Sequence, residues 1–330
     1  MKSVLRTTLA GLALLAAGTA AQAQTGNTIK FGLCYDLSKA YTFVTPQIVQ
    51  AVKDYAAILN AKGGIEGKQI EIIAQDHGNE PQRGIECYEK LKREGVMMFD
   101  YLSTPVSRAV LPRHMSDGLV MLQSFVGRGD AVDGDVFKWV FPIGPTYWGQ
   151  MANNIQYIKN VNKGNIKGKK VAFIYPDYAF GQEPIPVLKT LAAKEGFELG
   201  LFPNPMPGRD QAAVWTQIRR FDPDHVITWN LSAMHVVAAR EMKRNGIAMD
   251  KLISVNWFNE VDINNIGAAE AKGMKRGTNV VGGKEHPLMQ QIEKELYAAG
   301  KGNGDAKHLN DIYYNTGLAM YSVMFEGVRA

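Results

Sequence analysis

The chain has 330 residues, 46% of them hydrophobic, a formal net charge of +5 and two cysteines. So small a charge, without a long basic run, argues against a nucleic-acid partner, and the length suits about two domains. Beyond the N-terminus no stretch approaches about 18 uninterrupted apolar residues, so we expect no membrane-spanning helix.

Residues 1–23 have the pattern of a secretory signal peptide. Lys2 and Arg6 give a positive start, the apolar run LAGLALLAAGTA follows, and Ala21-Gln22-Ala23 is typical of a cleavage site. The run is too short for a membrane anchor, and no cysteine for lipid attachment stands at the cleavage point. Cleavage would leave 35 basic against 32 acidic residues. We therefore expect an exported, periplasmic protein.

Strand-like and helix-like runs then alternate along the chain. In the first half the expected strands are IKFGLCYD, QIEIIAQD, VMMFDYL and LVMLQSF, with helix patterns between them. After Pro145 the alternation restarts, with strands KKVAFIYPD, FELGLFP, HVITWN and LISVNW. Continuous apolar strands separated by helices indicate parallel sheets covered on both faces. Two such series predict an α/β fold of two doubly wound lobes.

The two cysteines allow two interpretations. Cys34 ends an expected strand and Cys87 lies within an expected helix. In an oxidising compartment they can form a disulfide, but two buried free thiols fit the same positions. The sequence leaves both alternatives open.

The sequence carries no pattern of an enzyme or a metal site. Nucleotide-binding glycine motifs, a P-loop and a serine nucleophile elbow are all missing. The six histidines are scattered and have no metal-ligand spacing. We therefore expect no catalysis, no cofactor and no metal.

The ends of the expected strands are rich in aromatic and small hydroxyl residues instead. These ends read YDLSKAYTF, DYLSTP, QSFVGR, PIGPTYW, YPDYAFG, WNLSAM and NWFNE. Ligands of parallel sheets bind outside the carboxyl ends of the strands, so this composition indicates a binding pocket. The alternative is that the aromatic residues fill the seam between two domains.

These residues resemble the periplasmic solute-binding proteins of ABC importers, in the branched-chain amino-acid-binding family. The most specific stretch is NAKGGIEGKQIEIIAQDHGNEP, which is similar to the family's N-x-x-G-G-I-x-G-x-x-I segment. DYLSTPVSRAVLP resembles the family's G-P-x-S-S loop and helix, and YPDYAFGQE resembles its D-x-x-Y-G loop. The segment 305–329 resembles the late helix that packs on the first lobe.

The resemblance implies a Venus-flytrap fold that closes on a ligand about a hinge. It places lobe 1 at residues 27–145 plus 283–330 and lobe 2 at residues 146–282. It also implies a monomer that delivers a small-molecule carboxylate to an ABC permease in the inner membrane. The family continues past the late helix with further strands and a last crossover, so whether this sequence is part of a longer chain stays open.

In lobe 1, Ser103 and Thr104 are the expected carboxylate cradle. Pro105 places a helix N-terminus there, where free N–H groups and the helix dipole favour an anion. The resemblance implies the same role, because the matching serines of the family bind the ligand's carboxylate. The other residues that we expect at the ligand in this lobe and at the first crossover are Tyr41, Ser124, Phe125 and Thr146.

In lobe 2, the expected ligand residues are Tyr178, Phe180, Asn230 and Trp257. The resemblance implies that Phe180 replaces a tyrosine of the family. It also implies that Trp257 stands at or near the acidic residue that pairs with a ligand's ammonium group. A tryptophan cannot neutralise an ammonium group, but its ring can stack on a flat ligand. We therefore favour an aromatic carboxylate as the ligand.

Three other functions stay open at this point. The first is binding of branched-chain or other amino acids, as in the rest of the family. The second is a ligand-sensing domain that reports to a membrane receptor. The third is an exported enzyme on the same fold, for which the sequence offers no nucleophile and base.

Overall fold

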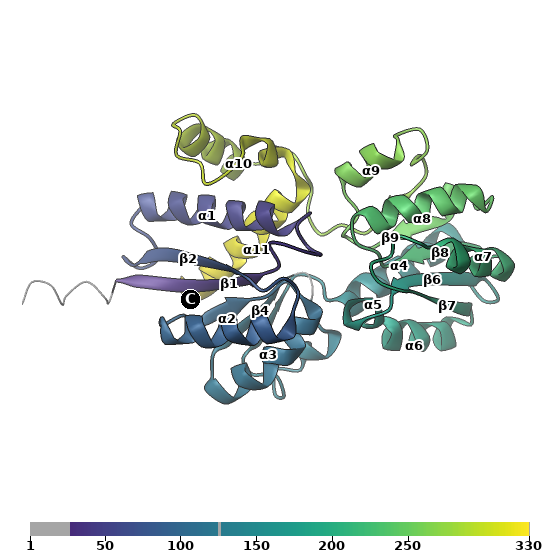
Figure 1. Cartoon of the computed structure of the whole chain (residues 1–330), viewed down its shortest axis with the longest axis horizontal. Helices are drawn as coiled ribbons and strands as arrows, with labels where there is room; N and C mark the ends of the chain where they lie inside the picture. Colours follow the sequence, from purple (N-terminus) through teal and green to yellow (C-terminus); the bar gives the residue numbers. More distant parts are fainter. Residues whose placement is uncertain (1–26, 125–126, 330) are drawn as a thin grey trace, which may run out of the picture.

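The computed structural model describes residues 27–124 and 127–329 and contains two α/β lobes side by side (Figure 1). The predicted signal peptide and Phe125 lie outside the described residues. Among the described residues no helix is long and apolar enough to span a membrane.

The first lobe is built on a parallel five-stranded sheet in the order β2-β1-β3-β4-β5. Its strands are β1 (Thr28–Tyr35), β2 (Gln69–Asp76), β3 (Met98–Asp100), β4 (Val120–Ser124) and β5 (Val140–Ile143). The connections contain α1 (Thr45–Ala61), α2 (Pro81–Arg93), α3 (Thr104–Asp117) and the 3₁₀ turn η1 (Gly129–Val132). A proline in the first turn starts each of the three α-helices, as suits a residue without an N–H group.

The second lobe has a parallel sheet in the order β7-β6-β8-β9-β10. Its strands are β6 (Lys170–Pro176), β7 (Glu198–Asn204), β8 (His225–Thr228), β9 (Leu252–Ser254) and β10 (Lys275–Arg276). Its helices are α4 (Tyr147–Val161), α5 (Ala179–Gln182), α6 (Ile185–Glu195), α7 (Ala212–Phe221), α8 (Ala233–Arg244), η2 (Met249–Lys251) and α9 (Glu260–Ile266). The strand order repeats that of the first sheet, so the predicted fold class of two doubly wound lobes is confirmed.

The C-terminal part of the chain returns to the first lobe (Figure 1). It contains α10 (Pro287–Ile292), the π-helical turn η3 (Glu293–Tyr297), η4 (Ala306–Asn310) and α11 (Ile312–Arg329). α11 packs along α1 so closely that a Cβ atom on Gly317 would lie 3.0 Å from the Cβ of Ala51. The buried carboxylate of Asp54 accepts hydrogen bonds from Tyr297 and Tyr314, both at 2.7 Å, and so fixes this segment on α1.

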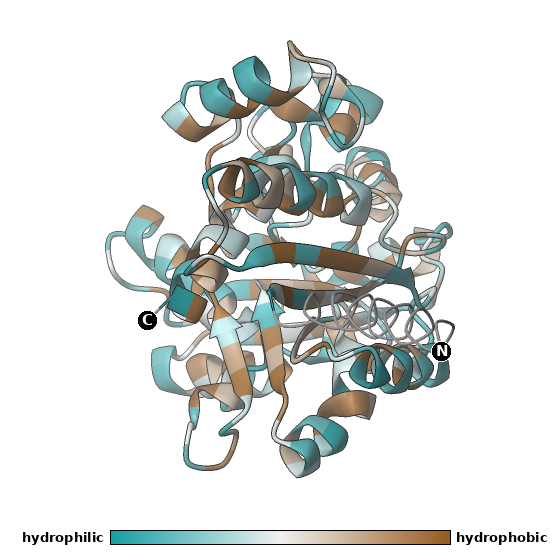
Figure 2. Ribbon diagram, turned by 90° about the vertical axis from the view of Figure 1, so that its left-hand side faces the viewer, coloured by the Kyte–Doolittle hydropathy of each residue, from teal (hydrophilic) through white to brown (hydrophobic). Residues whose placement is uncertain are grey.

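The chain passes between the two sheets twice, first between β5 and α4 and again after β10 (Figure 1). The exact lobe boundaries at residues 145 and 282 stay a prediction. Helices cover both faces of each sheet, and hydrophobic stretches run along strands in the interior (Figure 2). The core combines these strand residues with the inner faces of the helices.

The two cysteines form a disulfide, which decides between the two alternatives left open by the sequence. Cys34 of β1 and Cys87 of α2 have their Cα atoms 6.2 Å apart, and both residues are buried. The bond therefore fastens α2 to the centre of the first sheet.

Candidate functional site

The carboxyl ends of both sheets meet along a seam between the lobes. We define this interlobe seam by the aromatic residues that contact one another across it: Tyr41, Phe43 and Tyr313 from lobe 1, and Tyr178 and Trp257 from lobe 2. Because ligands of doubly wound sheets bind outside the carboxyl ends of the strands, the seam is the candidate site.

Tyr41 is held in place by a tight loop after β1. The buried carboxylate of Asp36 accepts hydrogen bonds from the backbone N–H groups of Lys39, Ala40 and Tyr41, at 2.8, 2.6 and 3.0 Å. The hydroxyl of Tyr41 then lies 3.2 Å from that of Tyr178 in the other lobe. Burial raises the pKa of both phenols, so both hydroxyls keep their protons, and one of the two can donate to a ligand oxygen.

Tyr178 follows β6 on a turn that requires a glycine three residues later. A Cβ atom on Gly181 would lie 2.0 Å from the carbonyl oxygen of Pro176, so no other residue fits there. Phe180, within the same turn, is fully buried, so its contact with a ligand stays a prediction. Its ring packs against Tyr147 at 5.3 Å and Trp229 at 6.3 Å, behind Tyr178.

Ser103 and Thr104 lie at the N-terminus of α3, as expected. The Ser103 hydroxyl caps the helix by accepting from the N–H of Val106 at 3.4 Å, and it donates to Asn79 Oδ1 at 2.7 Å. Neither the amide nor the hydroxyl of Thr104 has a hydrogen-bond partner within the described residues. α3 contacts α5 of the other lobe, so this helix borders the space between the lobes. Leu102, just before it, holds a φ of 43°, a conformation that costs a branched residue energy.

The hydroxyls of two further expected site residues, Ser124 and Thr146, form hydrogen bonds with other groups of the protein. Ser124, at the end of β4, donates to Asp100 Oδ2 at 3.0 Å, and Tyr35 donates to the same oxygen at 2.7 Å. Burial raises the pKa of Asp100 to about 6 despite these donors. Thr146 caps α4 by accepting from the N–H of Gly149 at 3.2 Å. Contact of either hydroxyl with a ligand stays a prediction.

Trp257 crosses the seam and contacts lobe 1 directly. Its ring lies 6.3 Å from that of Phe43 and 5.9 Å from that of Tyr313, and its indole N–H donates to the Tyr147 hydroxyl at 3.0 Å. Beside it, Asn256 and Tyr313 line a small cavity of about 10 Å³, enough for one water molecule. The carbonyl oxygen of the Asn256 side chain and the Tyr313 hydroxyl are buried there without partners among the described residues.

Asn230 lies just beyond β8 and is fully buried. Its side-chain amide donates to the carbonyl oxygen of Met234 at 3.4 Å, while its side-chain oxygen has no partner within the described part of the chain. Asn230 therefore keeps an acceptor available at the carboxyl edge of sheet 2.

An ion pair also joins the lobes near the first crossover. Arg108 on α3 pairs with Glu183, between α5 and α6, and Trp148 donates from its indole N–H to the Glu183 carbonyl at 3.0 Å. The Glu183 side chain is 7% exposed and that of Arg108 is 41% exposed. Burial raises the pKa of Glu183, and Arg108 offsets part of that effect. The same residues line a pocket of about 360 Å³ together with Arg128 and Asp130.

The residues that define the seam provide aromatic rings and phenol hydroxyl groups. The described residues contain no cluster of histidine, cysteine or carboxylate side chains that fits a metal ion. The arrangement suits the binding of a small molecule between the lobes.

Comparison with known proteins decides the family. A model of the periplasmic binding protein family matches residues 28–330. The chain belongs to the periplasmic binding protein family. The predicted resemblance to solute-binding proteins of ABC importers is thereby confirmed. A search of curated proteins found no match.

Solved structures of periplasmic binding proteins show the same fold. A protein from the Pseudomonas fluorescens group, described as an ABC transporter permease, is 30% identical with a TM-score of 0.82, over 92% of this chain and 75% of that one. A Thermus thermophilus branched-chain amino-acid ABC transporter with bound valine is 16% identical, with a TM-score of 0.78 over 92% and 78%. An R. palustris solute-binding protein in complex with benzoate is 19% identical, with a TM-score of 0.71 over 92% and 81%.

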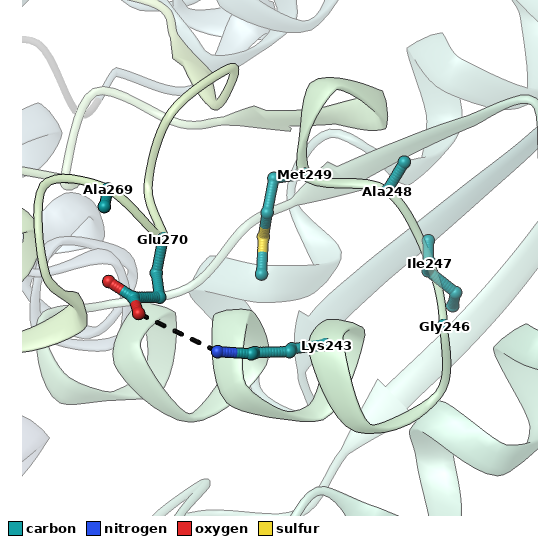
Figure 3. Close-up of a pocket in the computed structure, with 7 residues that line it drawn as sticks. All are labelled: Lys243, Gly246, Ile247, Ala248, Met249, Ala269 and Glu270. Atoms are coloured by element: carbon teal, nitrogen blue, oxygen red, sulfur yellow. Dashed lines mark ion pairs between the residues drawn. The ribbon is translucent and has the colours of Figure 1, made fainter.

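A pocket on lobe 2 lies away from the seam (Figure 3). It has a volume of about 490 Å³ and lies on lobe 2, where Lys243 pairs with Glu270 at 3.7 Å. Its lining includes the segment 246–249, which precedes β9. This pocket therefore lies at the amino ends of the strands, at the opposite edge from the seam.

Sequence reasoning missed two residues of the seam, Phe43 and Tyr313, and also the ion pair of Arg108 with Glu183 that joins the lobes. Phe43 stands in the strand-end segment YDLSKAYTF, so its place in that aromatic-rich loop was a usable signal. Tyr313 gave no local signal, because it comes from α11 and reaches Trp257 only through the packing of that helix on lobe 1.

Proposed function

We propose that the protein is a periplasmic solute-binding protein that captures a small carboxylate, preferably an aromatic one, between its lobes. It then delivers this ligand as a monomer to an ABC permease of the inner membrane. The observation that carries the proposal is that the amide and the hydroxyl of Thr104, at the N-terminus of α3, have no hydrogen-bond partner within the described residues.

The lobe 1 side supports a carboxylate. The amide of Thr104, its hydroxyl and the positive end of the α3 dipole form a set of donors without a fixed positive charge. Tyr41 and Tyr178 hydrogen-bond to each other across the seam, which leaves one of their two phenol O–H groups to donate to a ligand. Donors of this kind bind a carboxylate group in preference to a cation.

The lobe 2 side supports an apolar or aromatic remainder. The residues that contact one another around Trp257 are Phe43, Tyr147 and Tyr313, all uncharged. None of these contact residues offers an ammonium group a carboxylate, although burial and the nearby carboxylates of Asp262 and Asp311 raise the pKa of the Tyr313 phenol. A flat ring could instead stack on these side chains, with a gain of about 0.5–1.5 kcal/mol per aromatic pair.

The relatives support both this ligand class and its main alternative. The R. palustris protein was solved with benzoate and the Thermus thermophilus protein with valine. Both are under 25% identical to this chain, so the choice rests on the seam residues. Binding of branched-chain amino acids is the second candidate, because cation–π contact with Trp257 could replace the missing carboxylate.

Titration calorimetry of the purified protein with benzoate, phenylacetate, leucine and valine tests the proposal. We expect the aromatic acids to bind and the two amino acids to bind at least about tenfold more weakly, a difference of about 1.4 kcal/mol. Recovery of every ligand unaltered after incubation is expected of a binding protein. Micromolar binding of leucine without binding of aromatic acids would establish the second candidate instead.

A further inference from the structure

One face of sheet 2 carries a set of buried polar side chains without hydrogen-bond partners. The face is the one covered by α7 and α8, and the residues, which we call the polar row, are Asn204, Thr228, Asn230, His235 and Ser254. Each of them is fully buried, and each has at least one nitrogen or oxygen atom without a partner among the described residues. Buried polar atoms in native proteins are nearly always hydrogen-bonded, so we expect ordered water or a ligand group to pair with these atoms.

Strand alternation places these residues on one face. Val226 and Leu252 belong to the core beneath α7 and α8, and Thr228 and Ser254 follow them by two residues on their strands. Thr228 and Ser254 are direct neighbours in the register of β8 and β9. Their hydroxyls therefore lie next to each other, one step inside the carboxyl edge of the sheet.

The other three residues surround this pair. Asn230 lies two residues beyond Thr228, toward the seam, and Asn204 ends β7. His235 stands in the first turn of α8, on the side of the helix that also carries Ala238 and Met242 into the same core. The polar row thus runs from the carboxyl edge of the sheet inward beneath the start of α8.

On the corresponding face of lobe 1, several buried polar side chains of the described residues are hydrogen-bonded. Beneath α2 and α3, the Tyr101 hydroxyl lies 2.7 Å from His114 Nε2, and the His77 ring lies 3.0 Å from the Tyr101 carbonyl oxygen. The Gln123 side chain accepts from the N–H of Arg128 at 3.1 Å. The unpaired atoms of the polar row are therefore a feature of lobe 2 and do not come with the fold.

The chemistry of the polar row selects a neutral partner. It contains two amides, two hydroxyls and a histidine, and no residue that carries a fixed charge. Burial lowers the pKa of His235 to about 3, and the neighbouring Asn230 backbone offsets only part of this, so the ring is neutral at physiological pH. A charged group would lose its hydration here without an opposite charge, whereas a hydroxyl can both donate and accept.

We propose that the polar row is a subsite for a neutral hydroxyl group of the ligand, which enters past Asn230 to reach Thr228 and Ser254. This inference rests on the proposed function, since the ring of an aromatic acid would carry the hydroxyl. Trp229, directly before Asn230, packs with Phe180 and Tyr147. Trp229 and Asn230 are consecutive, so the chain itself joins these rings to the polar row.

Calorimetry with ligand pairs that differ by one hydroxyl tests the subsite. Benzoate is compared with 3- and 4-hydroxybenzoate in the unmodified protein, in the double variant T228V/S254A and in the control T216V. Thr216 has an exposed hydroxyl on α7 that donates only to the Ala212 carbonyl, at 3.0 Å. Thermal unfolding of each variant shows that it is folded.

We expect the unmodified protein and T216V to bind one hydroxybenzoate at least about tenfold more tightly than benzoate. T228V/S254A should lose this preference and bind benzoate within about twofold of the unmodified protein. Equal affinity for benzoate and both hydroxybenzoates, or a preference that survives in T228V/S254A, would overturn the subsite and leave a pocket for buried water only.

Failure of the proposed aromatic ligand class can be distinguished from failure of the subsite. If no aromatic acid binds, the same proteins are titrated with pentanoate and 5-hydroxypentanoate, which carry no ring. If the unmodified protein prefers 5-hydroxypentanoate and T228V/S254A does not, the subsite is supported and the aromatic ligand class is rejected. Absence of that preference in this pair as well would overturn the subsite.

Discussion

Ser103 and Thr104 are adjacent at the start of α3, yet their hydroxyl groups have different surroundings. Ser103 caps the helix and bonds Asn79, whereas the Thr104 hydroxyl has no partner within the described residues. The pattern S-T-P predicts a helix start and an anion site. It does not tell which of the two hydroxyls caps the helix and which remains for an anion. That division depends on Asn79, which reaches Ser103 from the loop after β2.

Thr104→Val should separate binding from stability at this helix end. The variant removes one donor to a charged group, so ligand affinity should fall by about 1.5–3 kcal/mol while thermal stability stays close to that of the unmodified protein. Ser103→Ala is the matched control, because loss of a cap should cost about 1 kcal/mol of stability. Calorimetry and thermal unfolding measure the two effects. Unchanged affinity in Thr104→Val would place the carboxylate elsewhere.

His114 should make the stability depend on pH. Burial lowers its pKa to about 4, and its ring lies 2.7 Å from the Tyr101 hydroxyl and 2.9 Å from the Leu119 carbonyl. The unfolded chain, with an ordinary histidine pKa near 6.5, binds a proton that the folded protein does not between about pH 6.5 and 4. This contribution to stability is therefore complete above pH 6.5 and is lost as the pH falls, by at most about 1.4 kcal/mol per pH unit.

His114→Gln should flatten this dependence. Urea unfolding at pH 7 and pH 4.5 gives the free energy of unfolding of both proteins, and their difference isolates the histidine from buried carboxyl groups such as Asp100, which act with the opposite sign. The variant also loses ring contacts with Tyr88 and Phe99, so we expect it to be less stable at pH 7 by roughly 1–3 kcal/mol. Parallel pH dependences would contradict the assignment.

At the scale of elements, the sequence predicts the long strands well and the short edge strands poorly. β1 and β6 are largely apolar runs of eight and seven residues, and their pattern alone indicates buried parallel strands. β2 and β7 are equally long but carry polar residues at the sheet edges. β10 has only Lys275 and Arg276 and carries no apolar pattern, so only its pairing with β9 defines it. The strand ends locate the site, but the contacts across the seam depend on how the two lobes meet.

The disulfide should stabilise lobe 1 substantially. Cys34 and Cys87 are 53 residues apart, and closing a loop of that length in the unfolded chain is worth about 4 kcal/mol in the chain-entropy model. Cys34→Ser with Cys87→Ser, or reduction, should therefore lower the free energy of unfolding by up to about this amount. Denaturant titration measures the loss, and ligand affinity is the control because neither cysteine lies at the seam. A change below about 0.5 kcal/mol would argue against the bond in solution.

At the scale of the whole molecule, the ion pair between Arg108 and Glu183 links lobe closure to charge. The two partners sit on different lobes, so any opening separates them. Because Arg108 is partly exposed, the pair itself is worth little, about 0.2–1 kcal/mol. Glu183 is nearly buried, and an unpaired carboxylate there is unfavourable while the lobes are together.

Arg108→Gln should therefore open the protein more than Glu183→Gln does. We expect a larger radius of gyration by small-angle scattering for Arg108→Gln, and a ligand affinity reduced by about two- to fivefold. The double variant should resemble Glu183→Gln, because no buried carboxylate is then left unpaired. Identical scattering for all four proteins would show that the pair has no part in closure.

The contacts of Trp257 with Phe43 and Tyr313 have a thermodynamic consequence. An aromatic ligand that stacks on Trp257 exchanges ring contacts that the protein already makes, so it removes little further apolar surface from water. Apolar burial is the source of a negative heat-capacity change on binding. Calorimetry between 10 and 35 °C should therefore give a binding enthalpy that varies little with temperature. Phe43→Ala uncovers one side of the Trp257 ring, and its binding enthalpy should fall more steeply as the temperature rises.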